Sequence, residues 1–203
     1  MKVSINYENL SSEDRAVLDK IIKKANAEKV KLSDIKDGDT FKIGDVEFIK
    51  FCDTDGIATV VTKDLQFRSE FGDNNDFANS KILKRLNNEF LPKISDLVGI
   101  ENICDITTDL TTLDGLKPYN DLVSKVSLPT LDFYRENVKV FDKYSVGAWW
   151  WLATPESAKP HDEPKWTVCV APSGNIDYYY YDYYFGVRPI LRFVSSIFVS
   201  YED

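Results

Sequence analysis

The sequence predicts an α+β protein in which a helical arm precedes one domain. Three observations lead to this fold class. Apolar residues near the N-terminus recur at the spacing of a helix, short apolar or alternating runs typical of strands follow after Leu32, and Gly, Pro, Asn and Asp turn signals separate those runs. We place the arm at residues 1–31 and the domain at residues 32–203.

The first predicted element is an amphipathic helix in the arm. Ser11 or Ser12 can cap its N-terminus, and Glu13 and Asp14 follow in the first turn, where acidic side chains interact favourably with the helix dipole. Two interpretations of its apolar stripe stay open: the helix packs on the body of the same protein, or it docks on another subunit or a larger assembly. The stripe comprises Val17, Leu18, Ile21, Ile22 and Ala25.

Strands are predicted at the start of the domain. Gly44-Asp45 separates two short apolar runs within residues 42–51, which predicts a β-hairpin. Residues 58–63 contain a run of β-branched residues and are expected to form a third strand.

A helix and a long connection are predicted in the middle of the chain. Asn79-Ser80 opens the helix, and Pro92 is expected to end it because proline interrupts helical hydrogen bonding. A short helix or turn is expected over residues 94–100. Residues 101–125 are polar and threonine-rich, and we expect them to form a mostly irregular connection.

The final third of the chain is predicted to begin with a strand and a helix and to continue mainly as strands. The strand and helix lie within residues 126–137, with Thr130 as the cap of the helix. The elements that follow are a tryptophan-rich strand at 148–155, a half-buried strand at 166–171, a tight turn at 172–175, a returning strand or loop at 176–184 and a closing core strand at 185–193.

Composition limits the classes of function. Of the 203 residues 43% are hydrophobic and 29% charged, which is typical of a soluble globular protein. The net charge of −8 argues against a nucleic-acid partner and against docking on anionic membranes. No apolar run is long enough for a transmembrane helix, and the N-terminus lacks the apolar segment of a secretory signal. We expect a cytoplasmic product or a virion component without membrane insertion.

Cysteine and histidine content argues against a metal centre. Cys52, Cys104 and Cys169 are widely spaced, which favours free thiols over a disulfide framework. The single histidine, His161, cannot form a zinc-histidine cluster, and residues 163–165 place a lysine where a calcium-binding lectin motif needs an oxygen ligand. We expect no metal and no cofactor.

A tyrosine-rich segment is the main candidate for a functional site. Both faces of a strand over this segment would carry tyrosine, although neither a core face nor a solvent face requires it. Tyrosine offers a large, rather rigid contact area with a polar tip, which favours a binding surface; a solvent-exposed aromatic ladder is the alternative. The candidate ligand-binding residues are Asn175, Asp177, Tyr178, Tyr179, Tyr180, Tyr181, Asp182, Tyr183 and Tyr184.

Structural support for this segment is expected from nearby tryptophans and an arginine. On a strand Trp149 and Trp151 share one face while Trp150 takes the other, so we expect them to pack beneath the tyrosines rather than to bind ligand. Arg188 lies among apolar residues and is expected to pair with a carboxylate or with backbone carbonyls.

A set of motifs occurs in a fixed order along the chain: Ser80 with LNNEFL at 86–91, SLPTLDFYREN at 127–137, WWWLATP at 149–155, SGN at 173–175 and GVRPILRF at 186–193. Together they resemble an uncharacterised domain family of Firmicutes and their phages, whose hallmark resembles WWLRSP, a variable stretch and then GVRPAL. The resemblance covers roughly residues 33–193 and implies a C-type-lectin-like fold, with small antiparallel sheets flanked by helices.

The resemblance also implies a function. In such folds the stretch between the tryptophan motif and the GVRP ending is the part that diversity-generating retroelements rewrite in their target proteins. Mutation of adenines converts Asn codons of the AAY type into codons for Tyr, Asp and Ser, and this stretch holds Asn175, six tyrosines and two aspartates. The resemblance therefore implies a variable protein whose partner is a protein or glycan on a cell or virion surface.

Two alternatives remain open. One is a structural or assembly module of a phage particle, with contacts through the N-terminal helix. The other is an oxidase of the formylglycine-generating type, which resembles a copper enzyme with a close pair of cysteines; Cys104 and Cys169 match no such motif. We expect a non-enzymatic protein without catalytic residues.

Overall fold

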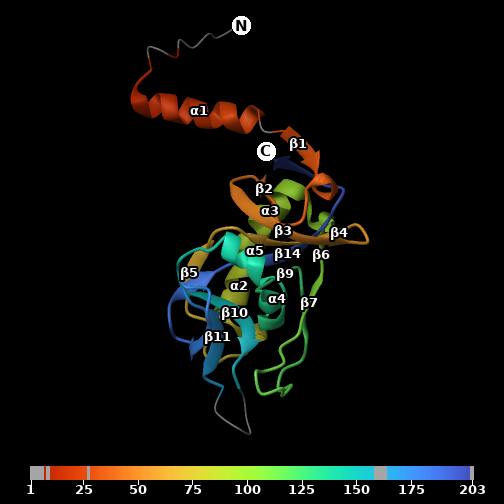
Figure 1. Cartoon of the computed structure of the whole chain (residues 1–203), viewed down its shortest axis with the longest axis vertical. Helices are drawn as coiled ribbons and strands as arrows, with labels where there is room; N and C mark the ends of the chain where they lie inside the picture. Colours follow the sequence, from red (N-terminus) through yellow and green to blue (C-terminus); the bar gives the residue numbers. More distant parts are fainter. Residues whose placement is uncertain (1–6, 8–9, 27, 158–163, 202–203) are drawn as a thin grey trace.

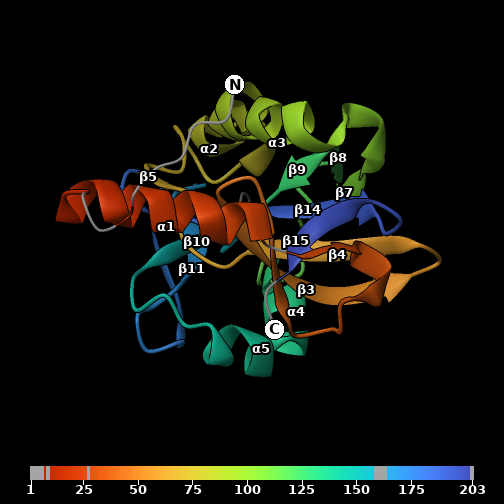
Figure 2. The same cartoon turned by 90° about the horizontal axis from the view of Figure 1, so that it is seen from above.

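The computed structural model describes residues 7, 10–26, 28–157 and 164–201 and has an α+β architecture (Figure 1). Its strands form an eight-stranded, a five-stranded and a two-stranded sheet, and nearly all strand pairs are antiparallel. Viewed from above, helices α2 and α3 lie on one side of the strands and α4 and α5 on the other (Figure 2). No helix among the described residues is both long and apolar enough to cross a membrane.

The eight-stranded sheet contains the predicted hairpin. Ile43 pairs with Val46 across the turn, where Gly44 has a φ of 63°, a backbone conformation that favours glycine. The third predicted strand, β4, pairs with β3, and both predictions are confirmed. In spatial order the strands are β1 (Glu28–Lys31), β15 (Phe198–Tyr201), β2 (Thr40–Ile43), β3 (Val46–Thr54), β4 (Ile57–Thr62), β14 (Ile190–Val194) and β6 (Ile103–Cys104), with β9 (Val126–Ser127) also paired to β14.

The five-stranded sheet contains the tryptophan-rich and tyrosine-rich segments. The predicted closing strand 185–193 is divided at Arg188-Pro189: β13 belongs to this sheet and β14 to the larger one. The segment therefore connects the two sheets. The order is β12 (Ile176–Tyr180), β11 (Trp166–Val170), β10 (Trp150–Pro155), β13 (Phe185–Val187) and β5 (Phe67–Ser69), and β10 and β13 are parallel.

The helices follow the predicted caps but not the predicted end at Pro92. The Oγ of Ser80 accepts a hydrogen bond from the amide of Leu83, and Thr130 caps α4 in the same way. Pro92 lies in the first turn of α3 because a π-helical turn precedes it, in which the Leu91 amide donates to the carbonyl five residues earlier. The helices are α1 (Ser12–Asn26), α2 (Lys81–Arg85), the π-turn η4 (Leu86–Phe90), α3 (Leu91–Val98), α4 (Leu131–Glu136) and α5 (Val138–Lys143), with 3₁₀ turns η2 (Leu32–Asp34), η3 (Phe77–Asn79) and η5 (Ile100–Asn102).

The mostly irregular connection predicted over 101–125 is confirmed in its middle, whereas short strands form near its two ends. Strand β6 joins the eight-stranded sheet beside β14. Strands β7 (Ile106–Thr108) and β8 (Leu122–Ser124) pair to form the two-stranded sheet. Each of these strands is only two or three residues long, too short for an alternating pattern to become visible in the sequence.

Two hydrophobic clusters form the core. The larger contains buried side chains of α2, η4 and α3, and the smaller contains those of α4 and α5. Strand β10 contributes to both, because Trp151 and Ala153 belong to the larger cluster and Trp150 and Leu152 to the smaller. Strand β11 also contributes to both clusters, with Cys169 in the larger and Val168 and Val170 in the smaller. It is therefore buried on both faces after Trp166, and the expectation of a half-buried strand was wrong.

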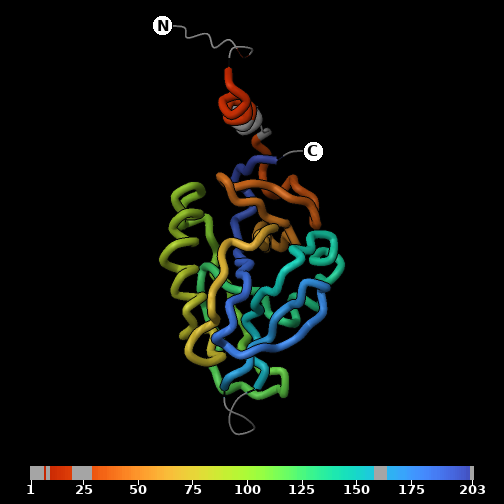
Figure 3. The backbone as a smooth tube through the Cα atoms, turned by 90° about the vertical axis from the view of Figure 1, so that its left-hand side faces the viewer, coloured from red at the N-terminus to blue at the C-terminus, as the bar shows by residue number. Residues whose placement is uncertain are grey.

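The helix of the predicted arm lies at one end of the molecule, beyond β1 (Figures 1 and 3). The structure describes the side chains of residues 12–19 of this helix, and none of them belongs to either cluster. Val17 is 58% exposed. Strand β1, the last part of the predicted arm, pairs with the C-terminal strand β15 and so extends the eight-stranded sheet.

Candidate functional site

The tyrosine-rich segment forms an edge of the five-stranded sheet. Strand β12 pairs with β11 on one side and has no strand on the other within the described residues. A tight turn, in which Gly174 has a φ of 85°, joins the two strands, so that Val170 faces Ile176 and Trp166 faces Tyr180. The edge position places the segment at the surface.

Exposure alternates along β12 and then becomes continuous. Tyr178, Tyr180, Tyr183 and Tyr184 are between 37% and 61% exposed. Tyr179, Tyr181 and Asp177 are half-buried, while Asn175 and Asp182 are exposed. Residues 175–184, which we call the tyrosine tract, thus present four exposed tyrosines at one edge of the five-stranded sheet.

Trp166 supports the rings on one side of β12. Its ring centroid lies 3.9 Å from that of Tyr180 and 5.7 Å from that of Tyr178. The sequence analysis did not assign Trp166 to the site. The register of the hairpin could have identified it, because a turn at 172–175 places Trp166 opposite Tyr180.

Trp149 and Phe185 support the rings on the other side of β12. The ring centroid of Tyr179 lies 5.0 Å from that of Trp149 and 5.3 Å from that of Phe185, and Tyr183 lies 5.0 Å from Tyr179. Trp149 and Phe185 stack on each other at 5.4 Å. Phe185 was also missed, since it directly follows the tract and resembles an ordinary core residue in sequence.

The backbone edge of β12 is partly blocked. The Asn175 carbonyl accepts a hydrogen bond from the Ala171 amide, and the Tyr181 amide donates one to the Lys165 carbonyl, both directly beside β11. By alternation, the peptide groups of Tyr178 and Tyr180 point away from the sheet. The Asp177 carboxylate accepts a hydrogen bond from the Tyr178 amide at 2.8 Å, and the Tyr180 carbonyl accepts one from the Tyr183 amide at 3.1 Å. Such local bonds hinder pairing with a further strand, so the tract offers side chains more readily than backbone.

Trp151 and Trp150 lie in the core on opposite faces of β10, as the alternation predicts. Trp151 is fully buried; its indole nitrogen donates to the Ser69 carbonyl at 3.0 Å and its ring contacts Phe185 at 4.7 Å. Trp150 contacts Tyr134 and Phe141 on the other face. Trp151 contacts Phe185, which in turn contacts Tyr179 of the tract.

Arg188 is buried between aromatic rings. Its Nε donates to the Thr62 carbonyl at 3.1 Å, and its guanidinium lies 5.2 Å from the centre of Phe141 and 5.1 Å from that of Trp150. Burial lowers the pKa of Arg188 to about 10, although the charges of Asp64 and Tyr134 act to raise it. The sequence predicted that Arg188 pairs with a carboxylate or with backbone carbonyls, and the structure shows the pairing with a backbone carbonyl.

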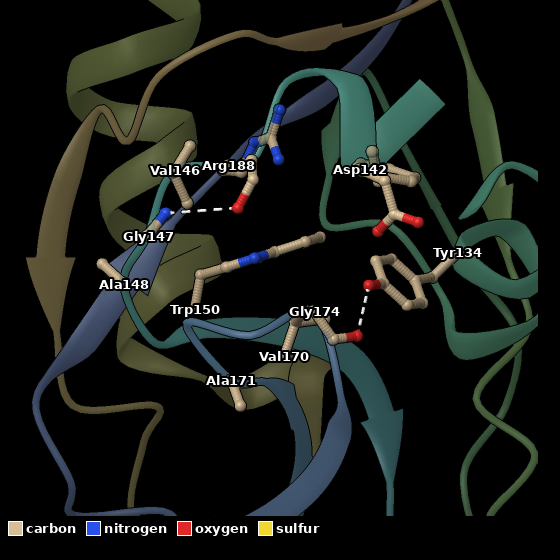
Figure 4. Close-up of a pocket in the computed structure, with 12 residues that line it drawn as sticks. Tyr134, Asp142, Val146, Gly147, Ala148, Trp150, Val170, Ala171, Gly174 and Arg188 are labelled. Carbon is tan, nitrogen blue, oxygen red and sulfur yellow. Dashed lines mark hydrogen bonds between the residues drawn. The ribbon is translucent and has the colours of Figure 1, made fainter. Parts of the chain in front are cut away.

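The cavity beside Arg188 is too small for an organic ligand. It measures about 10 Å³, the space of one water molecule. Figure 4 shows Trp150 between Arg188 and the hydrogen bond that the Tyr134 hydroxyl donates to the Gly174 carbonyl at 2.6 Å. This bond connects α4 to the turn that precedes β12.

Metal-ligating and nucleophilic residues do not converge in the part of the chain that the structure describes. Within it, no group of three or more His, Cys, Asp or Glu side chains could hold a metal ion. His161 and Glu163 lie outside the described residues. Cys104 is in the eight-stranded sheet and Cys169 in the five-stranded sheet, both as free thiols, and burial raises the pKa of Cys169.

Comparison of the chain with family models, with curated proteins and with solved structures found no match.

Proposed function

We propose that this protein binds a ligand without catalysing a reaction, and that the tyrosine tract is its contact surface. The partner is a protein or glycan on a cell or virion surface. The observation that carries the proposal is the position of the tract: four tyrosines are exposed at a sheet edge instead of filling a core. Exposed aromatic rings in this number favour recognition, since tyrosine is enriched where proteins bind partners.

The packing beneath the tract supports this role. Trp166 on one side and Trp149 with Phe185 on the other restrict the tyrosine rings before a partner arrives. A restricted ring loses less conformational entropy on binding, which improves affinity for the same contact area. Because the backbone of β12 is partly blocked, the partner is contacted by side chains and not by an added strand.

We also propose that the domain has a C-type-lectin-like fold and is the diversified target of a diversity-generating retroelement. The motif order supports this: the tryptophan motif forms β10, the GVRP motif lies at β13 and β14, and the tract lies between them in sequence but at the surface in space. A surface edge is where many substitutions are tolerated, because surface changes usually alter stability by only about 0.5 kcal/mol or less.

Binding is tested with a glycan array and intact bacterial cells. Labelled wild-type protein is compared with the double variant Tyr178→Ser/Tyr184→Ser, and Phe198→Ser serves as control because Phe198 is equally exposed, at 60%, on the distant strand β15. We expect the double variant to lose signal and the control to keep it. Equal binding by all three proteins would show that the tract is not the contact surface.

Diversification is tested by deep sequencing of the gene from a growing population. We expect substitutions in the codons of residues 175–184 to exceed those in the codons of 149–151, with a reverse-transcriptase gene and a near-repeat of codons 148–190 close by. Uniform low variation across both segments would contradict diversification, while leaving ligand binding to be judged by the array.

The helix α1 favours a second candidate, an assembly contact of a phage particle. Its stripe residue Val17 is exposed, and its described side chains belong to neither core cluster. Analytical ultracentrifugation of the full chain and of Val17→Glu tests this. Self-association that the variant abolishes would support the contact, and a monomeric wild-type protein would exclude a homo-oligomer formed through α1.

A further inference from the structure

A second cavity lies at the eight-stranded sheet, away from the tyrosine tract. It measures about 260 Å³, close to the lower end of typical ligand sites at about 300 Å³. Its floor is formed by β4 and β14, and its walls by β7 and the start of α4. The residues that matter for its chemistry are Thr59, Thr130, Phe133, Ile190 and Arg192.

The cavity lies where the smaller hydrophobic cluster stops covering one face of the eight-stranded sheet. Ile190 pairs with Val61, and both are buried in the smaller hydrophobic cluster. Two residues further along β14, Arg192 pairs with Thr59 and is only half-buried. The sheet face therefore continues past the cluster as a polar row, which borders the cavity together with β7.

Arg192 supplies the charge of the cavity. Its Nη1 donates to the Asp105 carbonyl at 3.4 Å, a long hydrogen bond, and no carboxylate of the described residues lies within salt-bridge distance. The chain has a net charge of −8, yet none of the residues that line this cavity is acidic. The local charge is thus opposite in sign to that of the protein.

The remaining lining is suited to a partly apolar molecule with oxygen acceptors. The hydroxyl of Thr59 makes no side-chain hydrogen bond to a described residue, so its proton is available to a ligand. The Thr130 oxygen accepts from the Phe133 amide, which leaves its own proton to donate. Phe133 and Ile190 add apolar surface.

We propose that this cavity binds a small organic carboxylate. Arg192 would pair with the carboxylate, whose planar geometry matches the guanidinium, the threonine hydroxyls would donate to its oxygens, and the apolar part would rest on Phe133 and Ile190. An inorganic ion alone fits less well, because the cavity is many times larger than the roughly 10–15 Å³ of such space that one water molecule needs. This site is independent of the tract and does not rest on the proposed ligand surface.

The test is an NMR titration of the ¹⁵N-labelled full chain with benzoate and with butyrate. Their neutral amides, benzamide and butyramide, serve as matched probes without charge. We expect saturable shifts of the Thr59, Thr107 and Arg192 amides with at least one carboxylate, and at least about tenfold weaker binding of the corresponding amide.

Two variants locate the charge. Arg192→Gln should weaken carboxylate binding at least about tenfold, whereas Arg135→Gln, the same substitution at an exposed arginine of α4, should leave it unchanged. If Arg192→Gln does not give a folded spectrum, Thr59→Val at a half-buried position opposite Arg192 takes its place, with weaker binding expected. No saturable shift with either carboxylate, equal binding of the amides, or shifts located elsewhere would overturn the proposal.

Discussion

Strands β10 and β12 belong to the same sheet, are both rich in aromatic residues and are separated only by β11, yet they have opposite surroundings. Every residue of β10 is buried, whereas exposed and half-buried residues alternate along β12. The difference shows that aromatic content does not by itself indicate a core or a binding surface. The position of a strand within its sheet decides which of the two its rings form.

The cause of the difference is the number of neighbours. Strand β10 has a strand on each side and lies between the two hydrophobic clusters, to which α2 and α4 contribute from opposite faces. Among the described residues strand β12 has one strand beside it, and its rings pack on Trp166 on one face and on Trp149 on the other, while Tyr178 and Tyr180 stay exposed. The predictions that follow test this division between scaffold and surface.

Trp151→Ala is expected to have the largest effect on stability. The fully buried indole contacts Phe71 and Phe185 and donates to Ser69, and removal of such a ring costs about 3–5 kcal/mol. Urea denaturation followed by circular dichroism measures the loss. Trp151→Phe is the control and should lose less, because a ring remains. A loss below about 1 kcal/mol for Trp151→Ala would mean that β10 is not the scaffold.

Arg188→Ala is expected to have the next largest effect. The Thr62 carbonyl loses its guanidinium donor, which costs about 1–3 kcal/mol, and contacts with Phe141 and Trp150 are lost as well. The variant should lower the melting temperature with or without a bound partner. A melting temperature equal to that of the wild type would show that Arg188 is dispensable for the scaffold.

Tyr180→Ser is expected to have a smaller effect on stability. Its ring packs on Trp166 at a centroid distance of 3.9 Å, and aromatic pairs contribute about 0.5–1.5 kcal/mol beyond buried area. Trp166→Ala measured alone and in the double variant completes a mutant cycle, and its coupling energy should fall in the same range. A coupling energy of zero would show that the Trp166 ring does not stabilise Tyr180.

Tyr184→Ser is expected to change stability least, by about 0.5 kcal/mol or less, because the side chain is 61% exposed and makes no ring contact with another described residue. In a titration with a partner found on the array or the cells, the same substitution should weaken binding about tenfold. A stability loss as large as that of Trp151→Ala would reverse the assignment of scaffold and surface.

Local rules predicted those features that depend on neighbours in sequence. The Gly44 turn, the helix start at Asn79-Ser80 and the cap at Thr130 were all predicted and observed, because each is decided within a few residues. Pro92 was misjudged because a π-helical turn, which has no sequence signature, accommodates it. Strand β6 was missed because its partner, β14, lies far along the chain.

The candidate site was predictable in composition but not in arrangement. The exposed tyrosines and the two faces of the tryptophan segment follow from alternation along single strands. Trp166 and Phe185 were missed because their role depends on which rings they meet across strands. The cavity at Arg192 combines residues from β4, β7, α4 and β14, and no single segment signals it.

The sequence alone determined the α+β class, the segments that form most strands and helices, and the concentration of tyrosine at residues 175–184, since these depend on composition and short-range periodicity. Only the tertiary structure decided that β12 is an edge and β10 a centre, that GVRPILRF is shared between two sheets, and that Arg188 bonds Thr62, 126 residues away. These outcomes depend on which strands pair over long separations, and pairing is decided by the burial of whole faces rather than by any local pattern.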